Sequence, residues 1–334
     1  MGLRRHDSDG RRLPMTAFGQ PPAWESPSSD PNDTTFGDVV EPTTLESTAE
    51  DGDFPDGEAT AAYDAVLVGE PYDRAVIGRQ GASEGPQAIR TALAGVKTHH
   101  FDRGSVDRRI ADIGDIAIPE RGVVTVQSEL ERAIMPLYEH GSRPIFLGGD
   151  NSLTVPNVGA AIEALPGSVG VISLDAHLDC REPVDGPSSG TPYYQLHERG
   201  LDAFAVVGAR HFETSSAYAA FVDEQGGTIV TADAVGRDFD AAVARALDAV
   251  SEVDHVLCSL DMDVLDATAA PGVSAPTPGG LTTRELYALL GRLGAEDRLV
   301  GFEVVECAPP LEDGSMTSDA AARAIAHLLS GWSR

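Results

Sequence analysis

Short apolar runs recur along this chain, and most are followed by a segment with helical periodicity. Two of the clearest, residues 169–174 and 256–260, are rich in β-branched residues and too short for helices. Such runs predict strands of a parallel sheet that is buried on both faces, because parallel strands are joined by crossover helices that cover the sheet. We therefore expect an α/β fold, a single three-layer α/β/α domain with a mostly parallel sheet.

The same pattern sets the expected organisation. Strands are expected at residues 65–69, 144–147, 169–174, 205–208, 228–230, 256–260 and 299–305, and helices at 124–139, 156–165, 217–225, 239–250, 283–293 and 318–329. Residues 1–60 are rich in Pro, Ser, Asp and Gly, so we expect an irregular or mobile segment there, and one α/β domain over 61–334. Met15 is an alternative start of translation to Met1.

Two acidic segments directly follow two of these strands. The first reads Asp-Ala-His-Leu-Asp over residues 175–179, and the second reads Asp-Met-Asp over 261–263. The carboxyl ends of parallel strands meet at one edge of a sheet, which is where ligands bind in open α/β folds. Because side chains at i and i+2 share a face of an extended chain, four carboxylates and one imidazole should converge.

A cluster of ionised carboxylates is too costly to bury unless a cation compensates it. The candidate metal ligands are Asp175, His177, Asp179, Asp261 and Asp263. One Asp-x-Asp after a strand is common as a helix cap or a salt-bridged turn, so the combination of both segments carries the prediction. Oxygen ligands with one imidazole favour Mn²⁺ over structural zinc, with nickel, cobalt and iron as alternatives.

The charge balance is strongly acidic. Asp and Glu number 53 against 24 Lys and Arg, which gives a net charge of −29, and Lys97 is the only lysine. Such a field repels nucleic acid and anionic membranes, so we expect neither as a partner. An acidic, lysine-poor surface indicates adaptation to high salt, which screens self-repulsion; an ordinary acidic cytosolic protein is the alternative.

The three cysteines, Cys180, Cys258 and Cys307, form no spaced pairs. A reducing compartment therefore fits better than a disulfide framework, and each cysteine is expected as a buried packing residue. No apolar stretch approaches the ~20 residues that a membrane span requires. These features favour a cytoplasmic protein with a small-molecule substrate.

Two more of the expected strands end in residues suited to the site. Asn151 follows a Gly-Gly-Asp turn and has a side-chain oxygen to offer, although Asn151 or Ser152 as a helix cap is the alternative. Glu306 ends the strand 299–305, where a substrate nitrogen would be met, whereas Glu303 suggests a sheet-edge charge.

Together these motifs resemble the arginase, agmatinase and formimidoylglutamase family, the binuclear manganese ureohydrolases. The resemblance runs from about residue 63 to the end and includes segments 69–73, 79–90 and 112–115. It implies an arginase-like fold, two Mn²⁺ per subunit and a homo-oligomer. It also implies that the five residues above are metal ligands, with Asp175 and Asp261 bridging the ions, and that Glu306 orients a nitrogen-rich substrate group.

Two departures from the family pattern matter. Asn151 stands where the family has a histidine that binds the more weakly held metal; since an amide oxygen is a weaker ligand, we expect a position of reduced affinity. Ser189 stands where many guanidino hydrolases have a histidine, within a Ser-Ser-Gly-Thr-Pro element that resembles formimidoylglutamases. Trp24 and residues 30–33 are reminiscent of the same subfamily.

The implied reaction is hydrolysis of N-formimidoyl-L-glutamate to L-glutamate and formamide, in histidine degradation. A metal-bridging hydroxide would attack the formimino carbon, Asp179 would pass a proton to the departing amine, and Glu306 would hydrogen-bond the formimino nitrogens. Arg181 and Arg210 are candidates to bind the substrate carboxylates, with a solvated or ion-paired structural role as the alternative.

Other functions remain open at this level. An agmatinase or guanidino-acid amidinohydrolase would use the same metals but release urea. A metal-dependent deacetylase fits less well, because its motifs are arranged differently. A catalytically silent binding or regulatory subunit is the third alternative, motivated by Asn151.

Overall fold

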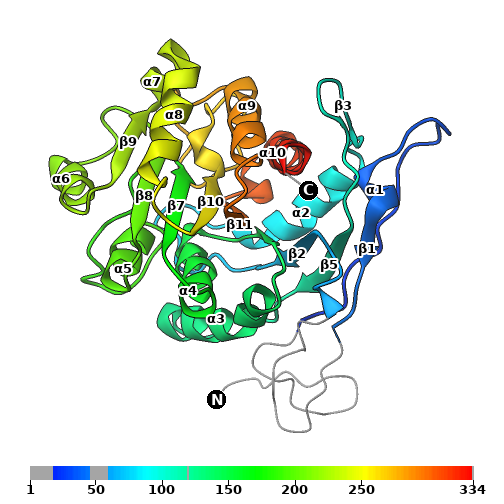
Figure 1. The fold of residues 1–334 in the computed structure, drawn as a ribbon, viewed down its shortest axis with the longest axis horizontal. Helices are drawn as coiled ribbons and strands as arrows, with labels where there is room; N and C mark the ends of the chain where they lie inside the picture. Colours follow the sequence, from blue (N-terminus) through cyan, green and yellow to red (C-terminus); the bar gives the residue numbers. More distant parts are fainter. Residues whose placement is uncertain (1–17, 46–58, 119, 333–334) are drawn as a thin grey trace, which may run out of the picture.

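The computed structural model describes residues 18–45, 59–118 and 120–332. Its centre is a nine-stranded sheet in the order β1-β5-β2-β6-β11-β10-β7-β8-β9, and every strand pairing in this sheet is parallel. Figure 1 shows β1 at one edge and β9 at the other. The strands are β1 (Val40–Pro42), β2 (Ala65–Gly69), β5 (Ile110–Asp115), β6 (Pro144–Leu147), β7 (Val169–Leu174), β8 (Ala203–Ala209), β9 (Thr228–Thr231), β10 (His255–Asp261) and β11 (Leu299–Val305).

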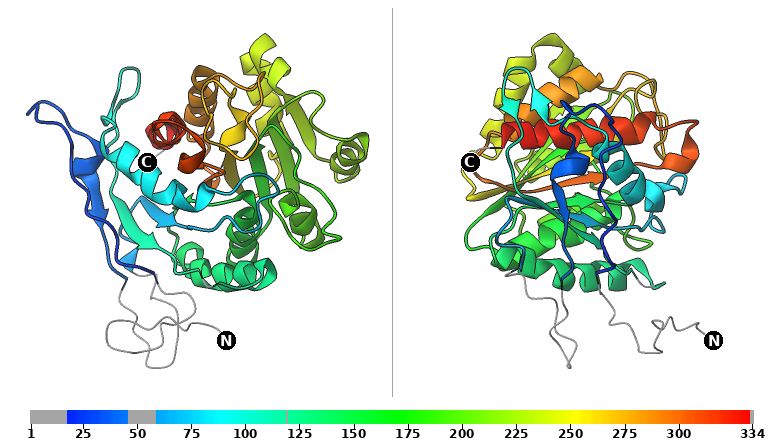
Figure 2. Two further views of the ribbon diagram at one scale, coloured as in Figure 1. Left: turned by 180° about the vertical axis from the view of Figure 1, so that it is seen from behind. Right: turned by 90° about the vertical axis from the view of Figure 1, so that its right-hand side faces the viewer.

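Helices cover both faces of the sheet, as Figures 1 and 2 show. One face packs against α2 (Gly85–Ala94), α7 (Ala232–Arg237), α8 (Phe239–Ala249), α9 (Thr283–Leu293) and α10 (Met316–Gly331). The other packs against α3 (Val123–Glu139), α4 (Thr154–Ala164), α5 (Pro192–Glu198) and α6 (Ser216–Glu224). Strand side chains alternate between the two cores: Leu67 joins the first and Val66 the second. The predicted three-layer α/β/α fold is confirmed.

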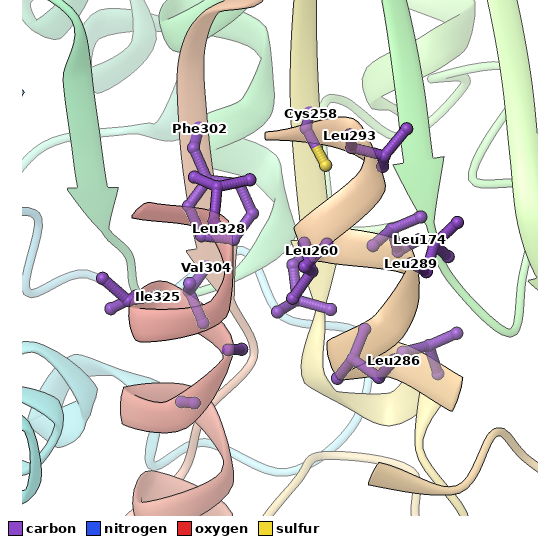
Figure 3. Close-up of a cluster of buried hydrophobic side chains, with 14 of the residues drawn as sticks. Leu174, Cys258, Leu260, Leu286, Leu289, Leu293, Phe302, Val304, Ile325 and Leu328 are labelled. Atoms are coloured by element: carbon purple, nitrogen blue, oxygen red, sulfur yellow. The ribbon is translucent and has the colours of Figure 1, made fainter. Parts of the chain in front are cut away.

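Leucine-rich helix faces fix the central strands in place. In Figure 3, Leu286, Leu289 and Leu293 of α9 lie over Leu174 and Leu260 near the carboxyl ends of β7 and β10. All five side chains are buried, and each such burial stabilises the fold by roughly 2 kcal/mol. The strand ends that carry the acidic segments therefore start from a rigid base.

The expected strands at 65–69, 144–147, 169–174 and 299–305 match at both ends, and the others are one to three residues longer. Strand β5 was missed, because Asp112 and Gly114 interrupt its apolar pattern. Asp112 is fully buried there, and it is neutralised by Arg90 of α2, whose Nε lies 2.7 Å from Asp112 Oδ2. Segments 79–90 and 112–115 thus meet in a buried ion pair.

Part of the segment that we expected to be irregular adds to the sheet. Residues Phe36–Val39 form α1, β1 pairs with β5, and Trp24 Nε1 donates to Asp112 Oδ2 over 2.8 Å. Met15 lies outside the described residues. A two-stranded antiparallel hairpin, β3 (His99–His100) and β4 (Gly104–Ser105), projects from the body in Figure 1.

Glu303 is not a sheet-edge charge. It lies on β11 between β6 and β10, in the middle of the sheet, and is 3% exposed. The three cysteines are free and buried, as expected. None of the helices in the described ranges is long and apolar enough to cross a membrane.

Candidate active site

The candidate site lies at the carboxyl ends of four neighbouring central strands, β6, β11, β10 and β7. In the strand register, Leu260 faces Leu174 on one side and Val304 on the other. The residues that follow these strand ends, Asp175 and Glu306, therefore lie close to Asp261 at one edge of the sheet. This convergence was predicted from the sequence.

Five candidate ligands form two interlocking groups. The ligand atoms of Asp175, His177 and Asp263 lie within 4.8 Å of one another, and so do those of Asp175, Asp179 and Asp261. Asp175 belongs to both groups, which is the placement that a ligand shared by two ions requires. The structure thus brings together all five residues; the second bridging role, expected for Asp261, stays a prediction.

Local turns orient the first aspartate of each segment. Asp175 Oδ1 accepts from the backbone N–H of His177 over 2.7 Å, and Asp261 Oδ1 accepts from that of Asp263 over 2.8 Å. Asp175 Oδ2 and Asp263 Oδ1 are also buried, and neither oxygen has a hydrogen-bond partner among the described residues. Buried carboxylate oxygens without donors are costly, so they fit a site that holds cations.

Electrostatics support the same assignment. Burial, reinforced by neighbouring carboxylates, raises the pKa of Asp175, Asp179 and Asp261, and it raises the pKa of Glu306 to about 8. Burial lowers the pKa of His177, but hydrogen bonds to Asp175 and Asp263 outweigh this and raise it to about 12. Without a cation the cluster retains protons. Its oxygen-rich donor set, with one imidazole, fits two divalent cations.

Glu213 is a site residue that the sequence analysis missed. Its Oε2 lies 3.3 Å from His177 Nε2, while Nδ1 of the same ring lies 3.1 Å from Asp263. A carboxylate on the far nitrogen of a metal-binding histidine fixes the ring and its tautomer. The signal available in the sequence was an acidic residue three positions after Arg210, just beyond a strand end.

Arg210 is held by the same carboxylate. Its Nε lies 3.0 Å from Glu213 Oε1 and its Nη1 donates to Thr277 O over 3.0 Å, in a side chain only 3% exposed. The ion-paired alternative therefore applies to Arg210. Its Nη2 has no hydrogen-bond partner among the described residues.

Asn151 lies in the site, in the short helix η3 (Asn151–Leu153) after β6. Its Nδ2 lies 2.5 Å from Asp179 Oδ2, and its Oδ1 lies 2.6 Å from Thr154 Oγ1. The amide nitrogen is the atom placed next to Asp179, and the role of Asn151 as a metal ligand stays a prediction. The alternative of Asn151 or Ser152 as the cap is wrong, because Asp150 caps this turn by accepting from Ser152 N over 3.0 Å.

The Gly-Gly-Asp turn is built for close backbone approach. A Cβ on Gly149 would lie 1.6 Å from the carbonyl oxygen of Tyr72, and Asp150 N donates to that oxygen over 2.8 Å. Asp150 Oδ2 also accepts from Ala75 N over 2.8 Å. This turn thus holds the loop after β2 against the site.

Backbone strain gathers at the site. Three non-glycine residues in the described part of the chain have positive φ: Asp179 at 40°, Phe212 at 69° and Glu306 at 62°. Each such conformation costs on the order of 1–3 kcal/mol and persists only where the surroundings enforce it. Glu306 is held by its N–H, which donates to Gly149 O over 2.8 Å. Two of the three are the candidate catalytic carboxylates.

Ser189 and Arg181 lie on the loop that follows the first acidic segment. Ser189 is 9% exposed, and its Oγ accepts from the N–H of Ile77 over 3.0 Å. The hydroxyl therefore ties this loop to the loop after β2. Arg181 is exposed, with its stem against Gly190, so its guanidinium is open to solvent.

The chain is similar to proteins of known activity. The arginase family model matches residues 63–331. The chain is 55% identical to a formimidoylglutamase of Halobacterium salinarum over 310 residues, which are 92% of this chain and 97% of that protein. The structure matches that of a Bacillus subtilis formimidoylglutamase with a TM-score of 0.81 and 30% identity, over 92% of this chain and 95% of that one.

A second solved structure carries metal. It is a Trypanosoma cruzi formiminoglutamase with Mn²⁺, matched with a TM-score of 0.77 and 26% identity over 90% of this chain and 98% of that one. The family match spans the whole sheet from β2 onward and contains every residue of the site. The chain therefore belongs to the arginase family.

Proposed function

We propose that this protein is a formimidoylglutamase, a manganese-dependent hydrolase that converts N-formimidoyl-L-glutamate and water to L-glutamate and formamide. The observation that carries the proposal is the pair of interlocking ligand groups that share Asp175, in a chain 55% identical to a curated formimidoylglutamase. The place of the reaction in histidine degradation follows from the substrate.

Two Mn²⁺ ions would be held by the five clustered residues. One group supplies Asp175, His177 and Asp263, and the other supplies Asp175, Asp179 and Asp261. When bound, such a pair of ions would lower the pKa of water and place positive charge beside the formimino group, whose nitrogen takes up the C=N electron pair as water oxygen adds to the carbon.

The protein's own carboxylates then position the substrate and move protons. Glu306 Oε1 accepts from Asn151 N over 3.0 Å, whereas its buried Oε2 has no partner among the described residues. This free oxygen is the acceptor that we assign to a formimino N–H. Asp179 lies at the same edge of the site, where its carboxylate can receive a proton and pass it to the departing amine.

Arginines would bind the two substrate carboxylates. Replacing Arg181 by Ala should raise KM for formimidoylglutamate about tenfold with little change in kcat, since a charge-assisted hydrogen bond contributes roughly 1.5–3 kcal/mol to binding.

Replacing Arg210 by Ala should raise KM and also lower kcat, because it frees Glu213 from its ion pair and loosens His177. Steady-state kinetics separate the two effects, and an unchanged KM removes that arginine from the binding site. Ser189 is assigned to the same subsite through the loop that it holds.

One assay tests the function. Purified protein in high salt with added Mn²⁺ should release glutamate and formamide from formimidoylglutamate, and no urea from agmatine or guanidino acids. Urea release would identify an amidinohydrolase instead. Fewer than one ion per chain and no turnover with excess Mn²⁺ would identify a silent subunit.

Three further properties complete the proposal. The acidic, lysine-poor composition supports a protein adapted to high salt, with a net charge of −29. The lack of spaced cysteine pairs supports the cytoplasm as its location. A homo-oligomer is proposed from the family resemblance. The domain boundary near residue 60 is not proposed again, because β1 precedes it and pairs with β5 in the main sheet; the rest of the predicted irregular segment, at 1–17 and 46–58, lies outside the described residues.

A further inference from the structure

Three loops meet beside Glu306. Ala308 N donates to Gly272 O over 2.7 Å, so the loop after β10 runs next to the chain that follows Glu306. The loop after β2 also reaches this junction, where a Cβ on Gly78 would lie 3.1 Å from Ser274 Cβ. Ser274 itself is half-buried. The fold thus places the Ser274 side chain next to a residue that we assign to the substrate.

Arg79 fixes Ser274 through the backbone. Its Nε donates to Ser274 O over 3.2 Å, and its Nη2 donates to Val273 O over 3.0 Å. Two donors of one planar guanidinium, bound to successive carbonyl groups, leave this stretch little freedom to rotate. Farther along the same loop, Arg210 Nη1 donates to Thr277 O over 3.0 Å. Both ends of the stretch are therefore held by arginines, and the Ser274 hydroxyl has a fixed position.

Glu306 and Ser274 present two neighbouring oxygens. Glu306 Oε1 accepts from Asn151 N over 3.0 Å, whereas its buried Oε2 has no hydrogen-bond partner among the described residues. Burial raises the pKa of Glu306 to about 8, and the Ser274 hydroxyl is near enough to act against this rise. A carboxylate oxygen and a hydroxyl oxygen both accept hydrogen bonds. A ligand that donates two N–H groups in one plane fits this pair.

The reacting group of the proposed substrate has this shape. The formimino carbon and its two nitrogens lie in one plane, and both nitrogens carry N–H bonds. Because amidines are protonated near neutral pH, their charge also favours the ionised form of Glu306. A formyl group has an oxygen in place of the terminal nitrogen, which sets acceptor against acceptor at this position. Leaving buried polar groups unpaired in this way is what makes a site reject an analogue.

We propose that Ser274 is a specificity-determining residue, which together with Glu306 accepts the N–H groups of an amidine and so excludes the corresponding carbonyl compound. Arg79 is the positioning residue that holds Ser274 there. The proposal rests on the proposed function for the identity of the reacting group, and it adds the residue that distinguishes C=N from C=O.

Two matched ligands give the first test. Ser274→Ala should lower kcat/KM for formimidoylglutamate about 10–100-fold, because a hydrogen bond to a charged group is lost. The inhibition constant of N-formyl-L-glutamate, which has no N–H at the terminal position, should change less than about twofold. Exposed Ser251→Ala is the matched control and should change neither value. A merely structural role of Ser274 would weaken both ligands alike.

A double-mutant cycle tests the role of Arg79. Arg79→Ala should lower kcat/KM about fivefold in the parent protein, but less than about twofold when Ser274 is already Ala, since Arg79 acts through that hydroxyl. Arg284→Ala, exposed on α9, is the matched control. Thermal unfolding of each variant shows whether a loss of activity reflects a loss of the fold.

Binding of acetamidine tests the contact without turnover. This small amidine has the planar pair of nitrogens and no carboxylate. Isothermal titration calorimetry on Mn²⁺-loaded protein should show Ser274→Ala weakening its binding about tenfold and Ser251→Ala leaving it unchanged. This result in a protein that does not hydrolyse formimidoylglutamate would support the role of Ser274 and overturn the proposed function alone.

The role of Ser274 is overturned by any of three results. These are a Ser274→Ala variant with the kcat/KM and acetamidine affinity of the parent protein, an equal loss for the substrate and for N-formyl-L-glutamate, or additive effects of Arg79→Ala and Ser274→Ala.

Discussion

Replacing Asp175 by Asn should leave the protein with less than one tightly bound Mn²⁺ per chain and lower kcat/KM for formimidoylglutamate by about 10³-fold or more. Asp175 is the residue common to both ligand groups, and its Oδ2 has no hydrogen-bond donor among the described residues. The amide keeps the size of the side chain but removes the charge that both positions use. Metal analysis after gel filtration and steady-state kinetics check the two parts of this result.

Exposed Asp248→Asn is the matched control, since it makes the same chemical change on the surface of α8. The Asp175 variant should remain folded without metal, because removing one of several crowded carboxylates relieves repulsion. Two tightly bound ions, together with normal activity in Asp175→Asn, would refute the shared-ligand geometry.

Metal-free protein should lose stability as the pH rises. Burial raises the pKa of Glu70 and of Glu306 to about 8 and that of Asp150 to about 6, whereas in the unfolded chain these groups titrate near pH 4. The folded state therefore binds more protons than the unfolded state between about pH 4 and pH 8. Their stabilising contribution is complete below about pH 4 and is lost as the pH rises through the folded pKa values.

Bound Mn²⁺ should reverse this trend, because ligands bind metal in their deprotonated form and binding strengthens as they lose protons. Urea denaturation in constant high salt from about pH 5 to pH 8 should show the free energy of unfolding falling by several kcal/mol without metal, and rising with excess Mn²⁺. Glu306→Gln should flatten the metal-free curve, whereas Glu163→Gln should not. A metal-free protein that gains stability over this range would contradict the prediction.

The fold was largely predictable because its signals are local. Strands β2, β6, β7 and β11 were predicted to the residue, since each is a short, mostly apolar run. Strand β5 escaped because a buried aspartate breaks its pattern, and only tertiary contact with Arg90 makes that aspartate tolerable. Strand β1 escaped because three residues at a sheet edge carry no periodic signal.

The residues of the site likewise fall into those that local sequence locates and those that only the tertiary structure identifies. Asp175, Asp179, Asp261 and Glu306 could be located from sequence, because parallel strands place their carboxyl ends at one edge whatever the details of packing. Glu213 could not be assigned to His177, since their contact depends on how the loop after β8 folds over β7. The outcome for Glu303, buried in the central strand and not at an edge, also needed the strand order.

Residue order along the chain is enough to predict the chemistry: an α/β sheet whose strand ends gather four carboxylates and an imidazole, which need cations to neutralise them. The tertiary structure decided how each polar atom is used. It set Arg210 in an ion pair, turned the amide nitrogen of Asn151 toward Asp179, and buried Glu303 behind Thr154. Residue types and spacing determine which groups meet, but the direction of a hydrogen bond depends on partners that are distant in the chain and are brought together only by the fold.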